Sequence, residues 1–147
     1  MKPALVLTCA GLLLVAMPAA AQSDRALLRE GNSLYEKEQY PDAEVSYRKA
    51  LEAAKEAVTA KFNLGDALYQ QGRFDEASGQ YESAVAEAED RDVKAQAYHN
   101  LGNALLKGKK YEESIGAYKE SLKLSPQDED TRYNLEYAKR LLQQQQQ

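Results

Sequence analysis

Histidine and cysteine, which often serve as catalysts and metal ligands, are almost absent from this chain of 147 residues. It holds one of each, His99 and Cys9. Nucleophile–base pairs and metal centres need several such side chains, or carboxylates, converging on one point. The acidic runs at 87–92 and 128–130 lack the glycine and the ligand spacing of a calcium loop. We therefore expect no catalytic site, no metal and no cofactor, and we interpret the protein as a non-enzyme.

Basic clusters are also scarce. Lys and Arg total 19 against 23 Asp and Glu, the formal net charge is −4, and the densest basic cluster spans only residues 107–110. A nucleic-acid-binding surface usually carries a basic patch or stripe, and the anionic surface of a membrane attracts the same feature. This composition therefore argues against a nucleic acid partner and against binding to a membrane surface.

The first 21 residues differ from the rest of the chain. Lys2 is their only charge, an apolar run covers residues 4–16, and a small-residue stretch ends at Ala21. This order predicts a secretory signal peptide over 1–21, cleaved after Ala21, with no membrane insertion of the mature chain. An uncleaved anchor is the alternative, although the run is short for a membrane span. Cys9 precedes most of the apolar run, which argues against lipidation.

An internal repeat dominates the remaining sequence. Aligning the chain on Gly31, Gly65 and Gly102 brings five further positions into register in all three copies. The recurring positions are Leu34, Leu68 and Leu105; Tyr40, Phe74 and Tyr111; Ala43, Ala77 and Ser114; Tyr47, Tyr81 and Tyr118; and Ala50, Ala84 and Ser121. Within each copy the apolar residues recur at helical spacing, so each copy predicts a hairpin of two helices.

These hairpins have predicted boundaries. The expected first helices cover 24–37, 58–71 and 95–108, the expected second helices cover 41–55, 74–88 and 111–124, and a further helix covers 128–142. Gly72 and Gly108 mark the turns of the second and third hairpins, and Pro41 opens the second helix of the first. Three extra residues around 88–92 predict a longer loop before the third hairpin.

The repeat resembles the tetratricopeptide-repeat (TPR) family, whose unit of about 34 residues has these small and aromatic positions. The match is best over residues 63–77 and 100–114. It implies an all-α fold, a TPR solenoid of three helical hairpins plus a C-terminal capping helix. The implied TPR domain covers 22–142, with repeats 24–57, 58–91 and 95–128, a capping helix over 128–142 and a Gln-rich tail over 143–147. The tail either extends the capping helix or frays.

The resemblance to this family also implies where a partner would bind. First helices of TPR hairpins line a concave groove, and the matching positions here are rich in Asn and Tyr, which suit recognition of an extended peptide. The implied protein- or peptide-binding residues are Arg25, Leu28, Asn32, Tyr35, Phe62, Asn63, Asp66, Tyr69, His99, Asn100, Asn103 and Lys107. Glu36, Gln70, Gln96 and Leu106 belong to the same face. The alternative is that several of them are solvated surface or contacts between repeats.

One TPR ligand is disfavoured. Chaperone-binding TPR domains hold a C-terminal carboxylate with a clamp of Lys, Asn and Arg. At the corresponding positions Asn32 and Asn63 match, whereas Leu28, Gln96 and Asn100 replace the three basic residues. A carboxylate would lack its charge-assisted hydrogen bonds, so we do not expect capture of an EEVD-type tail.

A narrower resemblance lies near the C-terminus. The segments YHNLGNAL at 98–105 and DTRYNLEYAKRLL at 130–142, followed by glutamines, resemble TPR proteins of bacterial aerotolerance (Bat) operons. Those proteins are exported and are encoded with membrane-anchored von Willebrand factor A domain proteins and a MoxR-type ATPase. The resemblance implies a periplasmic adaptor in an envelope-stress complex. A self-assembling structural protein (a homo-oligomer) and an accessory subunit of an envelope enzyme are the alternatives.

Overall fold

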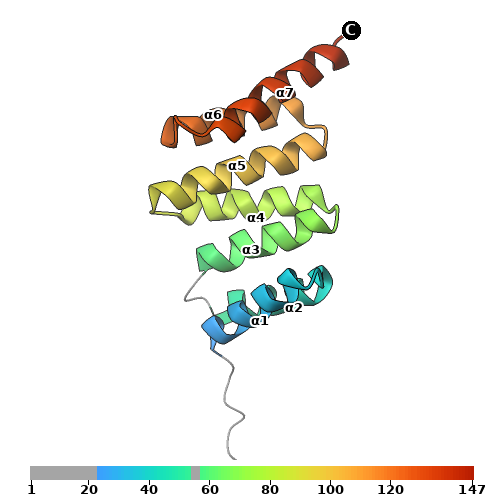
Figure 1. Cartoon of the computed structure of the whole chain (residues 1–147). Helices are drawn as coiled ribbons and strands as arrows, with labels where there is room; N and C mark the ends of the chain where they lie inside the picture. The colour runs from blue at the N-terminus through green and yellow to red at the C-terminus, as the bar shows by residue number, and fades with distance from the viewer. Residues whose placement is uncertain (1–22, 54–56) are drawn as a thin grey trace, which may run out of the picture.

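The computed structural model describes residues 23–53 and 57–147, and Figure 1 shows this part as a stack of helices. The predicted signal peptide and Cys9 lie outside the described residues. The helices are α1 (Asp24–Glu36), α2 (Tyr40–Ala53), α3 (Ala57–Gln70), α4 (Phe74–Glu87), α5 (Arg91–Lys107), α6 (Tyr111–Leu124) and α7 (Glu129–Gln145). The all-α solenoid predicted from the repeat is confirmed.

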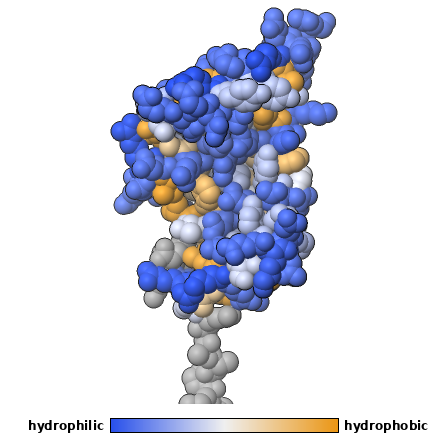
Figure 2. All heavy atoms as spheres, in the orientation of Figure 1, coloured by the Kyte–Doolittle hydropathy of each residue, from blue (hydrophilic) through white to orange (hydrophobic). Residues whose placement is uncertain are grey.

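Each helix packs on the next, so that α1–α2, α3–α4 and α5–α6 form three hairpins and α7 covers the last one. First helices of neighbouring hairpins also touch: α1 contacts α3, α3 contacts α5, and α5 contacts α7. Helix α7 therefore occupies the place of a fourth first helix. Figure 2 shows a surface dominated by hydrophilic side chains, with small separate apolar patches.

The repeated glycine and tyrosine positions form the closest contact within each hairpin. The rings of Tyr47, Tyr81 and Tyr118 are at most 2% exposed and lie against the backbone of Gly31, Gly65 and Gly102. A Cβ atom at these glycines would lie 2.4, 2.7 and 2.4 Å from the tyrosine Cε1 atom. Only glycine leaves room for the ring, because interiors are close-packed. This contact explains why the two residue types recur together.

Each turn between paired helices contains one residue with a left-handed backbone. The φ angles are +59° at Glu38, +74° at Gly72 and +61° at Lys109. Gly108 lies in the third turn, as the sequence predicts, but its φ is −74° and it ends α5 as the C-cap. The residue with the left-handed backbone is the next one, Lys109. A glycine relieves this strain only at its own position, so Gly108 does not relieve it at Lys109.

The three extra residues before the third hairpin do not form the longer loop that the spacing predicts. Helix α5 begins at Arg91 instead of 95, because the Asp90 side chain caps it by accepting hydrogen bonds from the backbone N–H of Asp92 and Val93, both at 2.9 Å. The insertion therefore lengthens the helix. At the other end α7 continues through Gln145, so most of the glutamine tail extends the capping helix.

Candidate ligand-binding groove

A row of hydrogen bonds runs along the inner face of the first helices. The buried tyrosine of each hairpin donates a hydrogen bond from its hydroxyl to the residue that follows the repeated glycine: Tyr47 Oη to Asn32 Oδ1 at 2.9 Å, Tyr81 Oη to Asp66 Oδ1 at 2.6 Å and Tyr118 Oη to Asn103 Oδ1 at 2.7 Å. These three pairs share one geometry, since each buried phenol needs an acceptor and the side chain after the glycine supplies it.

The next first helix completes each interaction. Asn63 Nδ2 donates to Asn32 Oδ1 at 3.0 Å, Asn100 Nδ2 to Asp66 Oδ1 at 3.1 Å, and Asn134 Nδ2 to Asn103 Oδ1 at 3.0 Å. We call the three acceptors with their tyrosine and asparagine donors the polar ladder. It ties every hairpin to its successor, and through Asn134 it ties α7 to the third hairpin.

Asn134 was not among the predicted site residues, although the sequence holds a signal for it. The pair Asn134-Leu135 repeats Asn63-Leu64 and Asn100-Leu101, which mark the start of the glycine motif in the second and third hairpins. Glycine is missing after this third pair, so an alignment anchored on glycine passes over it. The ladder position of α7 identifies it as a partial fourth repeat.

The structure divides the predicted groove residues into groups. Asn32, Asn63, Asp66, Asn100 and Asn103 belong to the ladder, while Tyr35, Tyr69, Phe62, His99 and Lys107 line hollows beside it. Arg25 is exposed outside these hollows. Leu28 was expected in the groove, but it is 7% exposed and packs in the hydrophobic core beside Leu27. A leucine on the core side of α1 follows the apolar stripe of the helix rather than the groove register.

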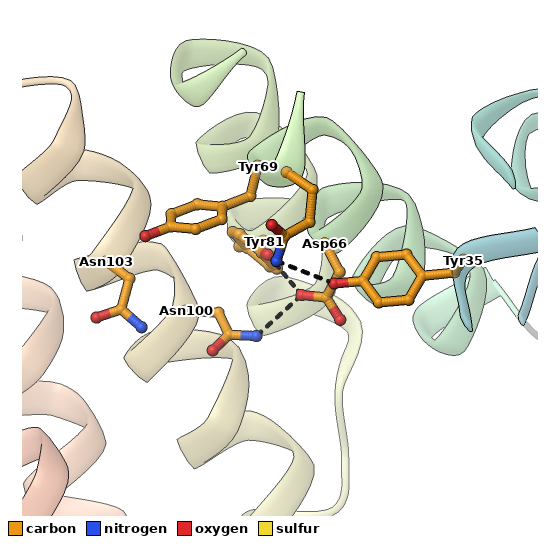
Figure 3. A pocket seen from close by; sticks show the side chains of 7 residues that line it. Tyr35, Asp66, Tyr69, Tyr81, Asn100 and Asn103 are labelled. Carbon is orange, nitrogen blue, oxygen red and sulfur yellow. Dashed lines mark hydrogen bonds between the residues drawn. The ribbon is translucent and has the colours of Figure 1, made fainter. Parts of the chain in front are cut away.

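The central hollow measures about 210 Å³ and lies between α1, α3, α4 and α5. It is lined by Tyr35, Asp66, Tyr69, Gln70, Tyr81, Asn100 and Asn103, most of which Figure 3 labels. Three phenol rings surround one carboxylate, and the remaining polar groups are neutral amides. The lining is therefore aromatic and carries one negative charge.

The walls of this hollow are held in place by further contacts. Gln70 Nε2 donates to the Tyr35 hydroxyl at 3.2 Å (Figure 3). The Tyr35 ring packs edge-on against Tyr40 with centroids 5.1 Å apart, and the Tyr69 ring packs likewise against Phe74 at 5.3 Å. Edge-to-face pairs of this kind fix ring orientation. The aromatic walls are thus preorganised rather than free to collapse into the hollow.

Burial dominates the chemistry of Asp66. It raises the pKa of the carboxyl group to about 6, and the hydrogen bonds from Tyr81 and Asn100 only partly offset that rise. Burial also raises the pKa of the Tyr81 phenol above its usual range. The carboxyl group therefore changes charge near neutral pH while the phenol beside it stays protonated.

Further hollows extend the groove in both directions. Towards the N-terminus about 220 Å³ is lined by Asn32, Tyr35, Glu36, Tyr47, Asn63 and Asp66. Towards the C-terminus about 500 Å³ is lined by Tyr69, Asn103, Leu106, Lys107, Lys109, Tyr111, Tyr133, Asn134, Tyr137 and Leu141. The groove is acidic at its N-terminal and central part and basic and tyrosine-rich beneath α7.

His99 fixes the start of α7 instead of facing a nucleophile. Its Nδ1 lies within hydrogen-bond distance of Thr131 Oγ1, and Thr131 donates the same hydroxyl to Asp128 Oδ2 at 2.6 Å. Because that hydroxyl proton goes to Asp128, Nδ1 acts as the donor to Thr131. Burial lowers the pKa of His99, against the opposing effect of Asp128 and Asp130. The neutral imidazole is thus a structural link between α5 and α7.

No group of three or more His, Cys, Asp or Glu in 23–53 and 57–147 is placed to hold a metal ion. None of the helices in that part of the chain combines the length and the apolar character needed to cross a membrane.

The sequence and fold match known proteins. Two tetratricopeptide-repeat models match residues 28–92 and 95–128, together about two thirds of the chain. No curated protein sequence matches it. Several solved structures share the fold. The first TPR of Spaghetti (RPAP3), bound to the HSP90 peptide SRMEEVD, has a TM-score of 0.75 and 24% identity, covering 83% of this chain and 94% of that one.

Two others agree. The first TPR domain of human RPAP3 has a TM-score of 0.77 and 23% identity, covering 86% of this chain and 98% of that one. The yeast Sti1 TPR2AB domain in complex with pHSP90 has a TM-score of 0.74 and 26% identity, covering 84% of this chain and 48% of that one. The repeat models, the stacked hairpins and these likenesses lead to one conclusion: the chain belongs to the tetratricopeptide-repeat family.

Proposed function

We propose that this protein is a non-catalytic adaptor that binds an extended segment of a protein partner along its concave groove. The observation that carries the proposal is the row of hollows beside the polar ladder, which runs from α1 to α7 and is lined by tyrosines and amides. Tyrosine offers contact area at a low entropic cost, and amides pair with a peptide backbone. Such a surface is better suited to binding a partner than to catalysing a reaction.

The ligand differs in kind from the acidic C-terminal peptides of the chaperone-binding relatives. The first RPAP3 domain is described bound to SRMEEVD. In this chain Leu28 lies in the core, and Gln96 and Asn100 are neutral. The hollow beside Gln96 and Asn100 also contains Asp128 and Asp130. A terminal carboxylate there would meet like charge, which disfavours it.

The cellular setting rests on the sequence. The signal-peptide pattern supports a periplasmic location, and the resemblance of 98–105 and 130–142 to Bat-operon TPR proteins supports an envelope-stress or aerotolerance complex. The partner proposed on that basis is a von Willebrand factor A domain protein anchored in the inner membrane. The groove then offers its hollows to a segment of that partner.

The direct test is binding of the purified protein to the soluble domain of a membrane-anchored von Willebrand factor A domain protein, measured by calorimetry. Lys107→Ala, which changes an exposed side chain in the C-terminal hollow, is expected to weaken binding. Lys119→Ala removes an equal charge from the exposed face of α6 and is the matched control. Equal affinities of the two variants would contradict groove binding, and no binding by the wild type would contradict this choice of partner.

Self-association is a second candidate, because two large side chains of the last helix are open to solvent. Tyr133 is 68% exposed and Tyr137 41% exposed. A solenoid end that presents such residues can stack on another copy. Light scattering across a wide concentration range tests this: oligomers in the wild type that disappear in Tyr133→Ala would support self-assembly, and a concentration-independent monomer would refute it.

A further inference from the structure

Asp66 is a charged group without a counter-ion. Several acids of the described residues have basic partners, such as Glu44 with Arg73 at 2.7 Å and Asp75 with Lys110 at 2.8 Å. The contacts of Asp66 in that part of the chain come instead from neutral groups, the Tyr81 hydroxyl and the Asn100 amide. A half-buried carboxylate is costly to leave unpaired. A positive charge is therefore the group that this position lacks.

Geometry leaves one oxygen of Asp66 available. Both hydrogen bonds end on Oδ1. Oδ2 of Asp66 is not one of the buried side-chain atoms that lack a hydrogen-bond partner among the described residues. Oδ2 is therefore accessible, and Asp66 lines both the central hollow (Figure 3) and the N-terminal hollow beside it. An incoming donor can reach it without breaking the polar ladder.

The walls of the hollow suit the same charge. Tyr35, Tyr69 and Tyr81 line it together with Asp66, and in Figure 3 the Tyr35 ring lies beside the carboxylate while the Tyr69 ring lies farther off, beyond Tyr81. Aromatic faces attract cations, most strongly where water is excluded, and carboxylates give charge-assisted hydrogen bonds to ammonium and guanidinium groups. Among the described residues that line this hollow there is no lysine or arginine. The arrangement complements a positive charge in both its carboxylate and its rings.

We propose that the central hollow is a subsite for the cationic side chain of a lysine or arginine from the bound partner, held by Asp66 Oδ2 between the rings of Tyr35 and Tyr69. The inference builds on the adaptor function, and it assigns specificity to one position of the groove. The volume of the hollow, about 210 Å³, is large enough for the end of such a side chain to enter.

Asp66 is the group whose raised pKa gives binding at this subsite a pH dependence near neutral pH. The side chains that face Asp66 from the elements packed around it are Tyr35 and Glu36 of α1, Tyr47 of α2, Tyr69 and Gln70 of α3, Tyr81 of α4, and Asn100 and Asn103 of α5. Burial raises the pKa of Tyr35, Tyr47, Tyr69 and Tyr81, so these phenols stay neutral below pH 9. With the pKa of Asp66 at about 6, affinity for a cation rises about tenfold between pH 5 and 7.5.

Two small probes test the subsite without the natural partner. Nα-acetyl-lysine-N-methylamide and its uncharged analogue Nα-acetyl-norleucine-N-methylamide are titrated into isotope-labelled protein at low salt, and side-chain amide resonances of Asn100 and Asn103 are followed by NMR. The lysine probe is expected to saturate with a Kd on the order of 10 mM. The norleucine probe is expected to leave those resonances unchanged.

Variants complete the experiment. Asp66→Asn keeps the shape and the ladder acceptor, and it is expected to weaken binding of the lysine probe at least about fivefold at pH 7.5. Glu89→Gln removes one charge from the exposed turn after α4 and is the matched control. Equal binding of both probes, or undiminished lysine binding by Asp66→Asn, would overturn the subsite. Neither result bears on whether the groove binds the protein partner, which calorimetry measures separately.

Discussion

The Tyr81 hydroxyl donates a hydrogen bond of 2.6 Å to Asp66 Oδ1, whereas the equivalent tyrosines donate to Asn32 and Asn103. The three equivalent acceptor positions of the ladder therefore hold an amide at Asn32 and Asn103 and a carboxylate at Asp66. Both side chains offer the oxygen that the tyrosine and the next asparagine need. The carboxylate adds a buried charge that the ladder does not use, which is a cost to stability unless a ligand offsets it.

Asp66→Asn is therefore expected to stabilise the free protein at neutral pH. The pKa of Asp66 is about 6 in the folded chain and about 3.9 unfolded, so the folded state binds the extra proton. Wild-type stability then decreases as pH rises from about 4 to 6, and the deficit is complete above that window. Urea denaturation at pH 7.5 is expected to show a gain of about 1–3 kcal/mol for the variant.

The same comparison at pH 4 is the control for that prediction. At pH 4 Asp66 is protonated in the folded state and about half protonated in the unfolded state, so the gain of the variant is expected to fall to about 0.5 kcal/mol or less. A gain that stays constant between pH 4 and 7.5 would show that a change in packing, and not the charge, distinguishes the two side chains.

Gly65→Ala is expected to destabilise the second hairpin by about 1–3 kcal/mol, since the added Cβ would lie 2.7 Å from Cε1 of the buried Tyr81 ring. Gly79→Ala is the matched control. Gly79 is exposed in α4, and a Cβ atom there would have no atom within 4 Å. Alanine at this position is therefore expected to raise the free energy of unfolding by about 0.5–1 kcal/mol through its higher helix propensity. Thermal melts of both variants distinguish the two effects, and a stable Gly65→Ala protein would refute the close contact.

The register of glycine and tyrosine made the hairpins predictable, because a close contact restricts residue types at both partners. Where no such contact restricts the residue types, some details of the structure were not predicted. Leu28 fits both the apolar stripe of α1 and a groove position of the repeat. Only the packing of the structure shows that its side chain lies in the core. Asp90 caps α5 and turns an expected loop into helix, which spacing alone does not reveal. The asparagines of the groove were correctly placed on one face, but their pairing with each other depends on distances between helices.

Glu38→Gly is expected to stabilise the protein by about 0.5–1 kcal/mol. Glu38 is exposed at the turn between α1 and α2 with a φ of +59°, a conformation that is strained for a side chain and free for glycine. Lys37→Gly is the control, because its φ of −87° needs no such freedom and glycine there only adds entropy to the unfolded chain. Chemical denaturation of the pair should give shifts of opposite sign, and equal shifts would contradict the strain at Glu38.

Thr131→Val is expected to loosen α7 while leaving the first two hairpins intact. The residue is fully buried, and its hydroxyl accepts from His99 and donates to Asp128, so the isosteric valine leaves both groups without that partner, at about 1–3 kcal/mol. In a solenoid each repeat contacts only its neighbours, so the loss stays local. Hydrogen exchange should accelerate in α7 and remain unchanged in α3. Thr59→Val, at an exposed position of α3, should alter neither, and faster exchange in every helix of Thr131→Val would indicate that the solenoid opens as one cooperative unit.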